Sequence, residues 1–426
     1  MKDRGRYWSV KINRVYKFRL YPNRDQQVIL NKTFGCCRFL WNRMLHERTE
    51  TYQRLKDNKD DLYSHKYKTE KEYKQQFHFL KEVDAKALQS STNNLLVAFK
   101  NFFDKLKKQR KAGYPRFKSR KSKQSYTTYN INNNTKIDFR KKKIKLPKVK
   151  TWIKYRDDRV FEEKIKHVTV SKTKSGKFYI SILIQQDSDC PIKTTISHSK
   201  IQAFDMSFPK FLVSTQEDFH NPRFYRKEEK TLQRLHHRLS RKIVGSKNRN
   251  KTRIRLARKY DQIYNRKNDW THKISHKLAN EYDAVILEDL NIEGMKKFRK
   301  GYSKSATLDF SWNKFVNTLR YKLEQQGKHL ILVDRWFPSS KQCSHCGNKN
   351  KELKLSERIW TCKNCGSIHN RDKNASKNLL IEGYKQLKMQ NVSIISTVGT
   401  TGSHAREDDV RYPLDTVVDE PRIHCH

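Results

Sequence analysis

The chain has 426 residues, and its 94 Lys and Arg against 44 Asp and Glu give a formal net charge of +50. This length predicts two to four domains, and such an excess of positive charge argues against an enzyme that handles only small molecules. Aromatic residues make up 11% of the chain, too many for a disordered basic tail. The composition therefore indicates a folded protein whose partner is a polyanion such as a nucleic acid.

The sequence shows neither an export signal nor a membrane segment. Its first twenty residues lack an apolar stretch, and no window approaches eighteen apolar residues. Four of the eight cysteines form two C-x-x-C pairs, which is typical of a metal site in a reducing compartment. We therefore expect a cytoplasmic protein with no membrane partner.

The first hundred residues predict one strand followed by helices. Residues 13–21 are rich in Val, Tyr, Phe and Leu and end before Pro22, as expected of a strand. Two sets of apolar residues then recur at helical spacing: Leu30, Phe34, Cys37, Trp41 and Met44, and later Leu95, Phe99, Phe102 and Leu106. We interpret these stripes as the core of a helical bundle.

A basic segment follows at residues 105–123, with ten Lys and Arg and no acidic residue. Tyr114 and Phe117 are interleaved with the charge, a pattern typical of surfaces where bases stack beside phosphate contacts. Lys118, Arg120 and Lys121 are the candidate nucleic-acid ligands here, although a merely solvated surface remains the alternative. Short strand-like runs at 125–131, 143–145, 167–170 and 178–184 then predict a small β domain.

The second half of the chain alternates between strands and helices, which predicts an α/β arrangement. Strands are expected at 200–205, 210–214, 284–288 and 329–336, and helices at about 226–281 and 312–326. The first two strands should form a hairpin. Residues 223–267 contain seventeen basic residues and three acidic ones, so one helix face should lie along a phosphate backbone, with Arg238 and Arg241 as candidate contacts.

The spacing C-x2-C-x15-C-x2-C predicts a structural zinc site made by Cys343, Cys346, Cys362 and Cys365. Gly347 and Gly366 directly follow the two pairs, where a knuckle turn needs a residue without a Cβ. All four positions are thiolates, so no position is left for a metal-bound water and a catalytic zinc is not expected. A thioredoxin-type redox motif fits poorly, because neither pair opens a helix in a βαβ unit.

Three carboxylates stand at positions where nuclease chemistry would need them. Asp205 and Glu288 each end a predicted strand, and Asp372 begins a predicted helix just after the second cysteine pair. If the strands are neighbours and the helix packs across them, the three acids meet at one sheet edge and can hold two divalent metals, as in RNase H-like enzymes. A purely structural role for an acid at a strand end remains the alternative.

These motifs, in their order along the chain, resemble the TnpB family of insertion-sequence transposons. The resemblance rests on VYKFRLYPNRDQQVILNKTFGCCRFLWN, GYPRFKSRKSKQSY, FDMSFPKFLVST, VILEDLNIEGM, WFPSSKQCSHCG, LSERIWTCKNCG and NRDKNASKNLL. It covers nearly the whole chain up to about Met389. TnpB proteins are RNA-guided DNA endonucleases similar to compact type V CRISPR effectors.

The resemblance implies a multidomain α+β fold. A wedge-type β domain is interrupted by a helical recognition domain and followed by an RNase H-like RuvC α/β domain with an inserted zinc ribbon. The implied ranges are 1–22 and 113–196 for the wedge domain, 23–112 for the recognition domain, 197–341 and 369–390 for the RuvC domain, 342–368 for the ribbon, and 391–426 for a disordered tail.

The resemblance also implies roles for individual residues. Asp205, Glu288 and Asp372 would be the first, second and third RuvC acids and would bind two Mg²⁺. Arg371 and Asn374 match the flanking pattern and would contact phosphate or order the acid. One segment departs from the family, because many members have Gly-Ile-Asp-Leu-Gly around the first acid, whereas residues 203–207 of this chain are AFDMS. Side chains in place of the two glycines leave less room between the backbone and a substrate.

The implied activity is cleavage of guide-matched double-stranded DNA beside a short flanking motif, with a guide RNA from the transposon end and no need for protein oligomers. A guide-RNA-directed repressor that binds without cutting is one alternative. A transposase that acts directly on transposon ends is another, weakened by the lack of a conspicuous nucleophilic Tyr with a His-rich pair. Cleavage of a guide-matched plasmid separates the first activity from the other two.

Overall fold

The computed structural model describes residues 10–109, 111–188, 193–207, 210–291, 311–354 and 356–395. The chain divides into two compact units, Met1–Asp189 and Cys190–His426. The expected tail at 391–426 lies outside the described residues from 396 onward. In the described part, no helix is long and apolar enough to cross a membrane.

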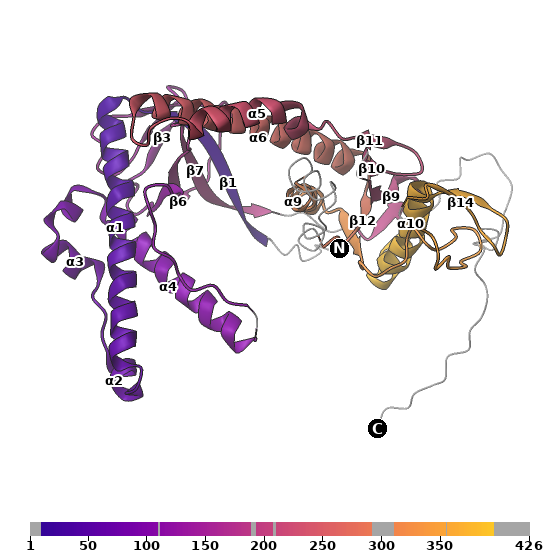
Figure 1. Ribbon diagram of the computed structural model, residues 1–426, viewed down its shortest axis with the longest axis horizontal. Helices are drawn as coiled ribbons and strands as arrows, with labels where there is room; N and C mark the ends of the chain where they lie inside the picture. The colour runs from indigo at the N-terminus through magenta and orange to yellow at the C-terminus, as the bar shows by residue number, and fades with distance from the viewer. Residues whose placement is uncertain are drawn as a thin grey trace, which may run out of the picture. The chain divides into compact units, whose positions relative to one another are not determined.

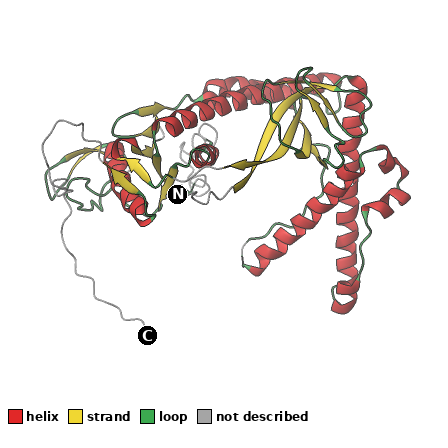
Figure 2. Cartoon of the chain, turned by 180° about the vertical axis from the view of Figure 1, so that it is seen from behind, coloured by secondary structure: helices red, strands yellow, loops and turns green. Residues whose placement is uncertain are grey.

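The first unit is built on a seven-stranded antiparallel sheet (Figures 1 and 2). Its spatial order is β2-β6-β7-β1-β5-β4-β3. The strands are β1 (Val10–Tyr21), β2 (Gln124–Tyr129), β3 (Lys136–Asp138), β4 (Lys143–Lys145), β5 (Ile153–Arg156), β6 (Ile165–Lys172) and β7 (Phe178–Ser188). The strand expected at 13–21 and the four short strand-like runs all belong to this sheet, whereas β3 and β5 were not predicted.

Helices between β1 and β2 complete this unit. They are α1 (Arg24–Leu55), α2 (Lys59–Ser64), α3 (Glu70–Gln76), a 3₁₀ helix at His78–Glu82, and α4 (Ala85–Lys107). A capping box starts α1, because the Asn23 side chain accepts from the Gln26 N–H while the Gln26 side chain accepts from the Asn23 N–H. The predicted apolar stripe of α1 is buried in one core with the inward strand residues, such as Phe18 and Ile180.

The second unit contains a five-stranded mixed sheet in the order β11-β10-β9-β12-β13. Its strands are β9 (Ile201–Met206), β10 (Lys210–Val213), β11 (Asp218–His220), β12 (Ala284–Glu288) and β13 (His329–Val333). The expected hairpin is confirmed, because β9 and β10 pair antiparallel. Strands β9, β12 and β13 run parallel, so their carboxyl ends share one edge of the sheet.

Among the described residues, smaller strands and four α-helices complete the second unit. The helices are α5 (Phe224–Ser240), α6 (Lys247–Glu281), α9 (Trp312–Glu324) and α10 (Arg371–Met389). The small strands pair as β8 (Thr195–Ser197) with β16 (Ser393–Ile395), and β14 (Ile359–Thr361) with β15 (Ile368–Asn370). The helix expected at 226–281 is in fact two helices, because the chain turns at Gly245, whose φ is +90°.

The five-stranded sheet is buried on both faces, as its alternating side chains require. Phe204 and Leu287 belong to a core shared with α6 and α9, whereas Ala203 and Ile286 face a second core that includes Leu379 of α10. Helix α10 comes unusually close to the sheet at Gly383, because a Cβ added there would lie 2.2 Å from Cδ1 of Ile286. The packing of α10 determines where its first turn, with Asp372, lies relative to β9 and β12.

Candidate functional site

Two of the predicted acids lie side by side at the carboxyl edge of the five-stranded sheet. Phe204 pairs in register with Leu287 across the parallel strands β9 and β12, so Asp205 and Glu288 follow at the same level. Burial, and then the charges of Glu288 and Asp372, raise the pKa of Asp205 well above its usual range. Asp205 therefore lies close enough to both other predicted acids to be affected by their charges.

Glu288 is the second acid with an altered proton affinity. Burial first, and the neighbouring Asp289 second, raise the pKa of Glu288 to about 7. Asp289 itself forms an ion pair with Arg335, and its backbone N–H donates to the Val333 carbonyl at 2.9 Å. Asp289 thus ties the end of β12 to the segment after β13, in keeping with a structural partner.

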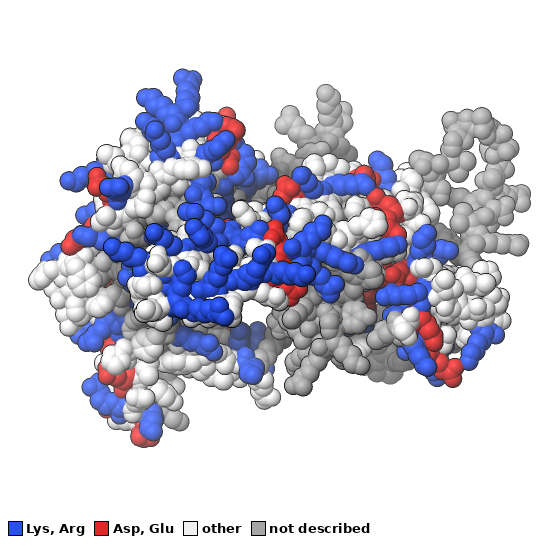
Figure 3. All heavy atoms as spheres, turned by 45° about the horizontal axis from the view of Figure 1, so that its top comes forward, with Lys and Arg blue, Asp and Glu red and all other residues white. Residues whose placement is uncertain are grey.

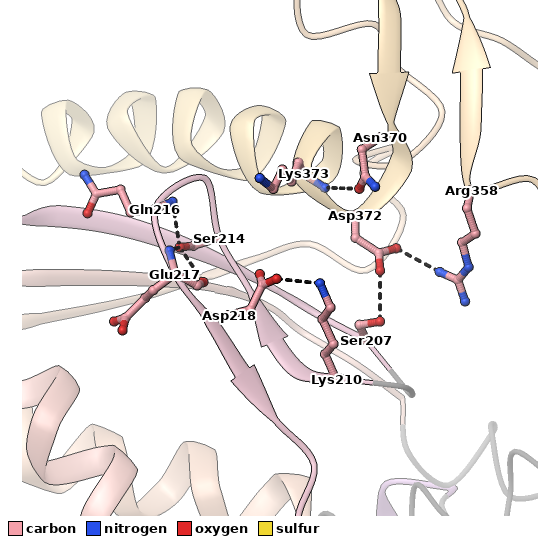
Figure 4. Close-up of polar contacts among 10 residues, drawn as sticks. All are labelled: Ser207, Lys210, Ser214, Gln216, Glu217, Asp218, Arg358, Asn370, Asp372 and Lys373. Atoms are coloured by element: carbon pink, nitrogen blue, oxygen red, sulfur yellow. Dashed lines mark hydrogen bonds and ion pairs between the residues drawn. The ribbon is translucent and has the colours of Figure 1, made fainter.

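Asp372 lies in the first turn of α10 and is held by two side chains from other elements (Figure 4). The Ser207 hydroxyl, just after β9, donates to Oδ2 of Asp372 at 2.9 Å. The Arg358 guanidinium, just before β14, donates to Oδ1 at 2.9 Å. The Asn370 side chain caps the helix by accepting from the Lys373 N–H. Both carboxylate oxygens of Asp372 are therefore oriented.

Ser207 and Arg358 contact the third predicted acid, which the sequence did not reveal. Ser207 was noted only as a departure from the family glycine, yet its side chain is buried and bonds the third acid. Arg358 lies four residues before the second cysteine pair. This position next to a metal knuckle was the one feature of the sequence that could have pointed to Arg358. Its side chain is 46% exposed, so a substrate phosphate could reach the guanidinium.

The two residues expected to flank the third acid have different environments. The positive charge of Arg371 offsets part of the rise in the pKa of Asp205 that burial and the other two acids cause. Asn374 is only 2% exposed, and its side chain accepts from the Ser344 N–H and donates to the Gln342 carbonyl. Its carboxamide thus binds the first knuckle to α10, which leaves it no surface for the expected phosphate contact.

The four predicted cysteines converge on one point. Their Sγ atoms all lie within 4.8 Å of one another, and none of the four thiols forms a disulfide. The four cysteines could therefore hold a single metal ion. The two knuckles repeat the same turn, because Gly347 N–H donates to the Cys343 carbonyl and Gly366 N–H to that of Cys362, both at 2.9 Å. Four thiolates at tetrahedral spacing suit zinc.

Local hydrogen bonds prepare some of these thiols for a metal. Hydrogen bonds from the side chain and backbone of Ser367 lower the pKa of Cys365 to about 5. The His369 Nε2 lies 3.0 Å from Sγ of Cys343, and its ring packs 4.8 Å from that of Trp360. His369 is buried and would orient the sulfur from outside the ligand set, a role that the sequence spacing did not suggest.

The basic segment of the first unit divides into packed and exposed cations. Nζ of Lys118 lies 3.3 Å from the centre of the Trp41 ring, and burial lowers the pKa of Lys118 to about 8. Arg120 and Lys121 are exposed. Of the three predicted ligands, these two present their full charge to solvent, and their contact with nucleic acid stays a prediction.

The outer face of the seven-stranded sheet carries a second basic and aromatic group. Arg19 and Tyr179 pair across β1 and β7, and the Arg19 guanidinium carbon lies 5.2 Å from the Tyr179 ring centre. Nζ of Lys17 lies 4.8 Å from the same ring, and Tyr21 is 50% exposed. Cations interleaved with aromatic rings suit a single strand of nucleic acid. The outward residues of one strand are separated by two positions, so sequence clustering did not show this group.

Helices α5 and α6 form an antiparallel pair that is rich in Lys and Arg. Arg238 and Arg241 are exposed, as expected. Figure 3 looks onto the face that carries these helices, and Lys and Arg side chains greatly outnumber Asp and Glu there. Glu228 of α5 accepts from Lys259 of α6 at 2.7 Å, so one of the few acids serves to join the pair.

Comparison with known proteins places the chain in a family. A protein of Streptomyces pristinaespiralis named "Putative RNA-guided DNA endonuclease" is 34% identical over 375 residues, covering 88% of this chain and 90% of its own. The chain belongs to the TnpB family. A protein of Escherichia coli K12 named "Putative RNA-guided DNA endonuclease InsQ" is 29% identical, covering 88% of this chain and 93% of its own.

Three family models match parts of the chain, and one solved structure is similar to it in fold. A "Helix-turn-helix domain" matches residues 12–57, a "Probable transposase" matches 184–299, and a "Cas12f1-like, TNB domain" matches 312–379. The protein chain in a structure titled as a Cas12f1-sgRNA-target DNA complex is similar in fold, with a TM-score of 0.51 and 15% identity, covering 87% of this chain and 99% of that one. The resemblance found in the motifs is thereby confirmed.

Proposed function

We propose that this TnpB-family chain is an RNA-guided DNA endonuclease encoded by an insertion-sequence element. The proposal is supported by the charges of Glu288 and Asp372, which raise the pKa of Asp205 at the carboxyl edge of the sheet. It is also supported by relatives named putative RNA-guided DNA endonucleases. The guide would derive from the transposon end and select the DNA by base pairing, while the protein recognises a short flanking motif and the backbone. The protein would act in the cytoplasm, at the nucleoid, without needing to oligomerise.

The sheet of the second unit supports a RuvC domain of the RNase H-like kind. A hairpin of β9 and β10 continues into β11, and β12 and β13 lie parallel to β9 with helices on both faces. In this proposal residues 197–341 and 369–390 form the RuvC domain and 342–368 the ribbon. Residues 1–22 and 113–196 form a wedge domain around a recognition domain at 23–112.

The acids fit two magnesium ions by their chemistry, because carboxylate oxygens are the ligands that Mg²⁺ prefers. Two such ions would activate the attacking water and stabilise the leaving oxygen of a phosphodiester. Asp205 and Glu288 would hold their carboxylates at the end of neighbouring strands. A bound cation would offset the burial and the negative charges that raise the pKa values of these two acids.

Ser207 and Arg358 would position the third acid. Their contacts fix both oxygens of Asp372, and Arg358 also brings a positive charge to the place where a phosphate would lie. Since Arg358 and the four cysteines belong to the same ribbon, a zinc ion there would steady the guanidinium as well as the knuckles. The ribbon would thus act on the site through Arg358 and Asn374.

The test is cleavage by the purified complex of protein and copurified guide RNA. A plasmid with the guide-matched sequence and flanking motif should be cut in Mg²⁺, whereas a plasmid with a scrambled target should stay intact. Binding of the matched plasmid without any cutting would replace the proposal by the repressor. Strand joining without a guide would replace it by a transposase acting on the transposon ends.

A further inference from the structure

Two aliphatic side chains stand almost fully in solvent at the turn between α5 and α6. Ile243 is 81% exposed and Val244 is 82% exposed. Isolated apolar residues are common on protein surfaces, but an adjacent pair of β-branched residues at the tip of a helical hairpin is not required by its packing. The hairpin has its own buried core around Leu232, Leu256 and Ile263, which includes neither of them.

The turn that presents this pair is firmly held. The Ser246 N–H donates to the Ile243 carbonyl at 3.2 Å, and Gly245 takes the positive φ of +90° that this turn needs. The Arg249 guanidinium donates to the carbonyls of Leu239 at 2.9 Å and of Lys242 at 2.7 Å. The apolar tip is therefore presented in one conformation, so that little conformational entropy is lost when it makes a contact.

The charge around the tip selects its partner. Residues 238–253 contain seven Lys and Arg and no Asp or Glu. Exposed cations thus flank the tip on both helices, as with Arg241 at the end of α5 and Lys247 at the start of α6. Two aliphatic side chains are too small an area for a stable protein dimer, but they match the face of a single base pair.

We propose that Ile243 and Val244 form a wedge that packs against the exposed base pair at the end of a nucleic-acid duplex. The cations on both sides of the turn would hold the last phosphates of the two strands, and the apolar tip would cover the base pair that has lost its stacking neighbour. The wedge rests on the nucleic-acid binding in the proposed function, but not on cleavage.

The test compares two RNA–DNA duplexes of the same sequence and the full-length protein. One has open ends with 2-aminopurine in a terminal pair, and the other is closed at both ends by hairpin loops. The parent should bind the open duplex about tenfold more tightly, the difference expected from partial burial of two aliphatic side chains, and should change the 2-aminopurine fluorescence. The double variant Ile243→Ser, Val244→Ser should lose both effects while its salt dependence stays the same.

Two matched variants complete the experiment. Met389→Ser removes another apolar side chain, 81% exposed on α10, and should keep the preference. Arg241→Ala with Lys247→Ala should flatten the salt dependence by about two units and keep the preference for open ends. Equal binding of both duplexes by a parent that still cuts its guided target would overturn the wedge alone. A concentration-dependent dimer that the double variant abolishes would also overturn it, in favour of a second copy.

Discussion

Glu288 and Asp205 make the stability of the metal-free protein depend on pH. Their carboxyls have raised pKa values in the folded chain, about 7 for Glu288, so folding holds protons that the unfolded chain releases near pH 4. The unfolded chain therefore binds fewer protons between about pH 4 and 7, and the free energy of unfolding should fall as pH rises through this window. Denaturant titrations at pH 5 and 7.5 without magnesium measure the fall.

The variant Glu288→Gln tests that assignment. The amide that replaces the carboxyl at position 288 does not titrate. The fall in the free energy of unfolding between pH 5 and 7.5 should therefore shrink by about 1–3 kcal/mol. Magnesium should restore stability to the parent at pH 7.5 more than to the variant, because only the parent has the full set of carboxylates. An identical pH dependence in parent and variant would show that Glu288 titrates normally.

At the scale of single residues, the sequence indicated which side chains form a site better than it indicated their hydrogen-bond partners. The four cysteines were predicted from their local spacing, and their thiols converge in the structure. The three acids were assigned from the family resemblance of the motifs around them, because spacing alone does not distinguish a catalytic acid from a structural one at a strand end. Asn374 was expected to contact phosphate or to order the third acid, and its side chain bonds the first knuckle. Ser207 and Arg358 were missed because their partner Asp372 is distant in sequence from Ser207 and belongs to a separate element.

Helix α10 depends on Gly383 for its distance from the sheet. Because a Cβ there would lie 2.2 Å from Ile286, Gly383→Ala should destabilise the protein by about 1–3 kcal/mol through overpacking. It should also slow cleavage, since a displaced α10 carries Asp372 away from Asp205. Thermal or denaturant unfolding and plasmid cleavage measure the two effects.

A second-site change and a matched glycine give the controls for Gly383. Ile286→Ala in the same chain should recover part of the cleavage rate by making room for the new methyl group. Gly35→Ala in α1, where nothing lies within 4 Å of an added Cβ, should be neutral or stabilising by up to about 1 kcal/mol. Equal effects of Ala at both glycines would mean that the close approach of α10 is not what matters.

The zinc ribbon should couple metal content to cleavage. Cys362→Ser should lower the zinc content, measured by elemental analysis, and should reduce cleavage more than guided binding, because the ribbon carries Arg358 and is bonded to α10 by Asn374. Ser367→Ala, which leaves all four thiols in place, should keep the zinc. Undiminished zinc in Cys362→Ser would contradict the four-thiolate site.

Elements with a strong local pattern were predictable, and short ones were not. The apolar run at β12 was found with its bounds, and β9 and β10 were recognised as a hairpin. Strands β14 and β15 have three residues each and are ordered by the turns around the cysteines, so hydrophobic periodicity carried no signal for them. The helical region expected at 226–281 consists of two helices with a turn at Gly245. The sequence did not reveal this turn, because an isolated glycine is also tolerated within a helix.

The charge of the whole molecule makes a prediction about salt. Arg120 and Lys121 are exposed, whereas Lys118 packs on Trp41. If the first two bind phosphates, their joint replacement by Ala should flatten the log–log salt dependence of RNA binding by about two units, and Lys118→Ala alone should change it by less than one. An unchanged slope in the double variant would show that this loop is only a solvated surface.

In the proposed function, Asp205, Glu288 and Asp372 act together in cutting a DNA target chosen by a guide. The most direct measurement is cleavage of a guide-matched plasmid by Asp372→Asn, with a gel-shift assay of the same complex in Mg²⁺. We predict that cleavage is lost and that binding is retained, because binding comes from phosphate contacts and base pairing. Cutting at the parental rate by Asp372→Asn would contradict the claim.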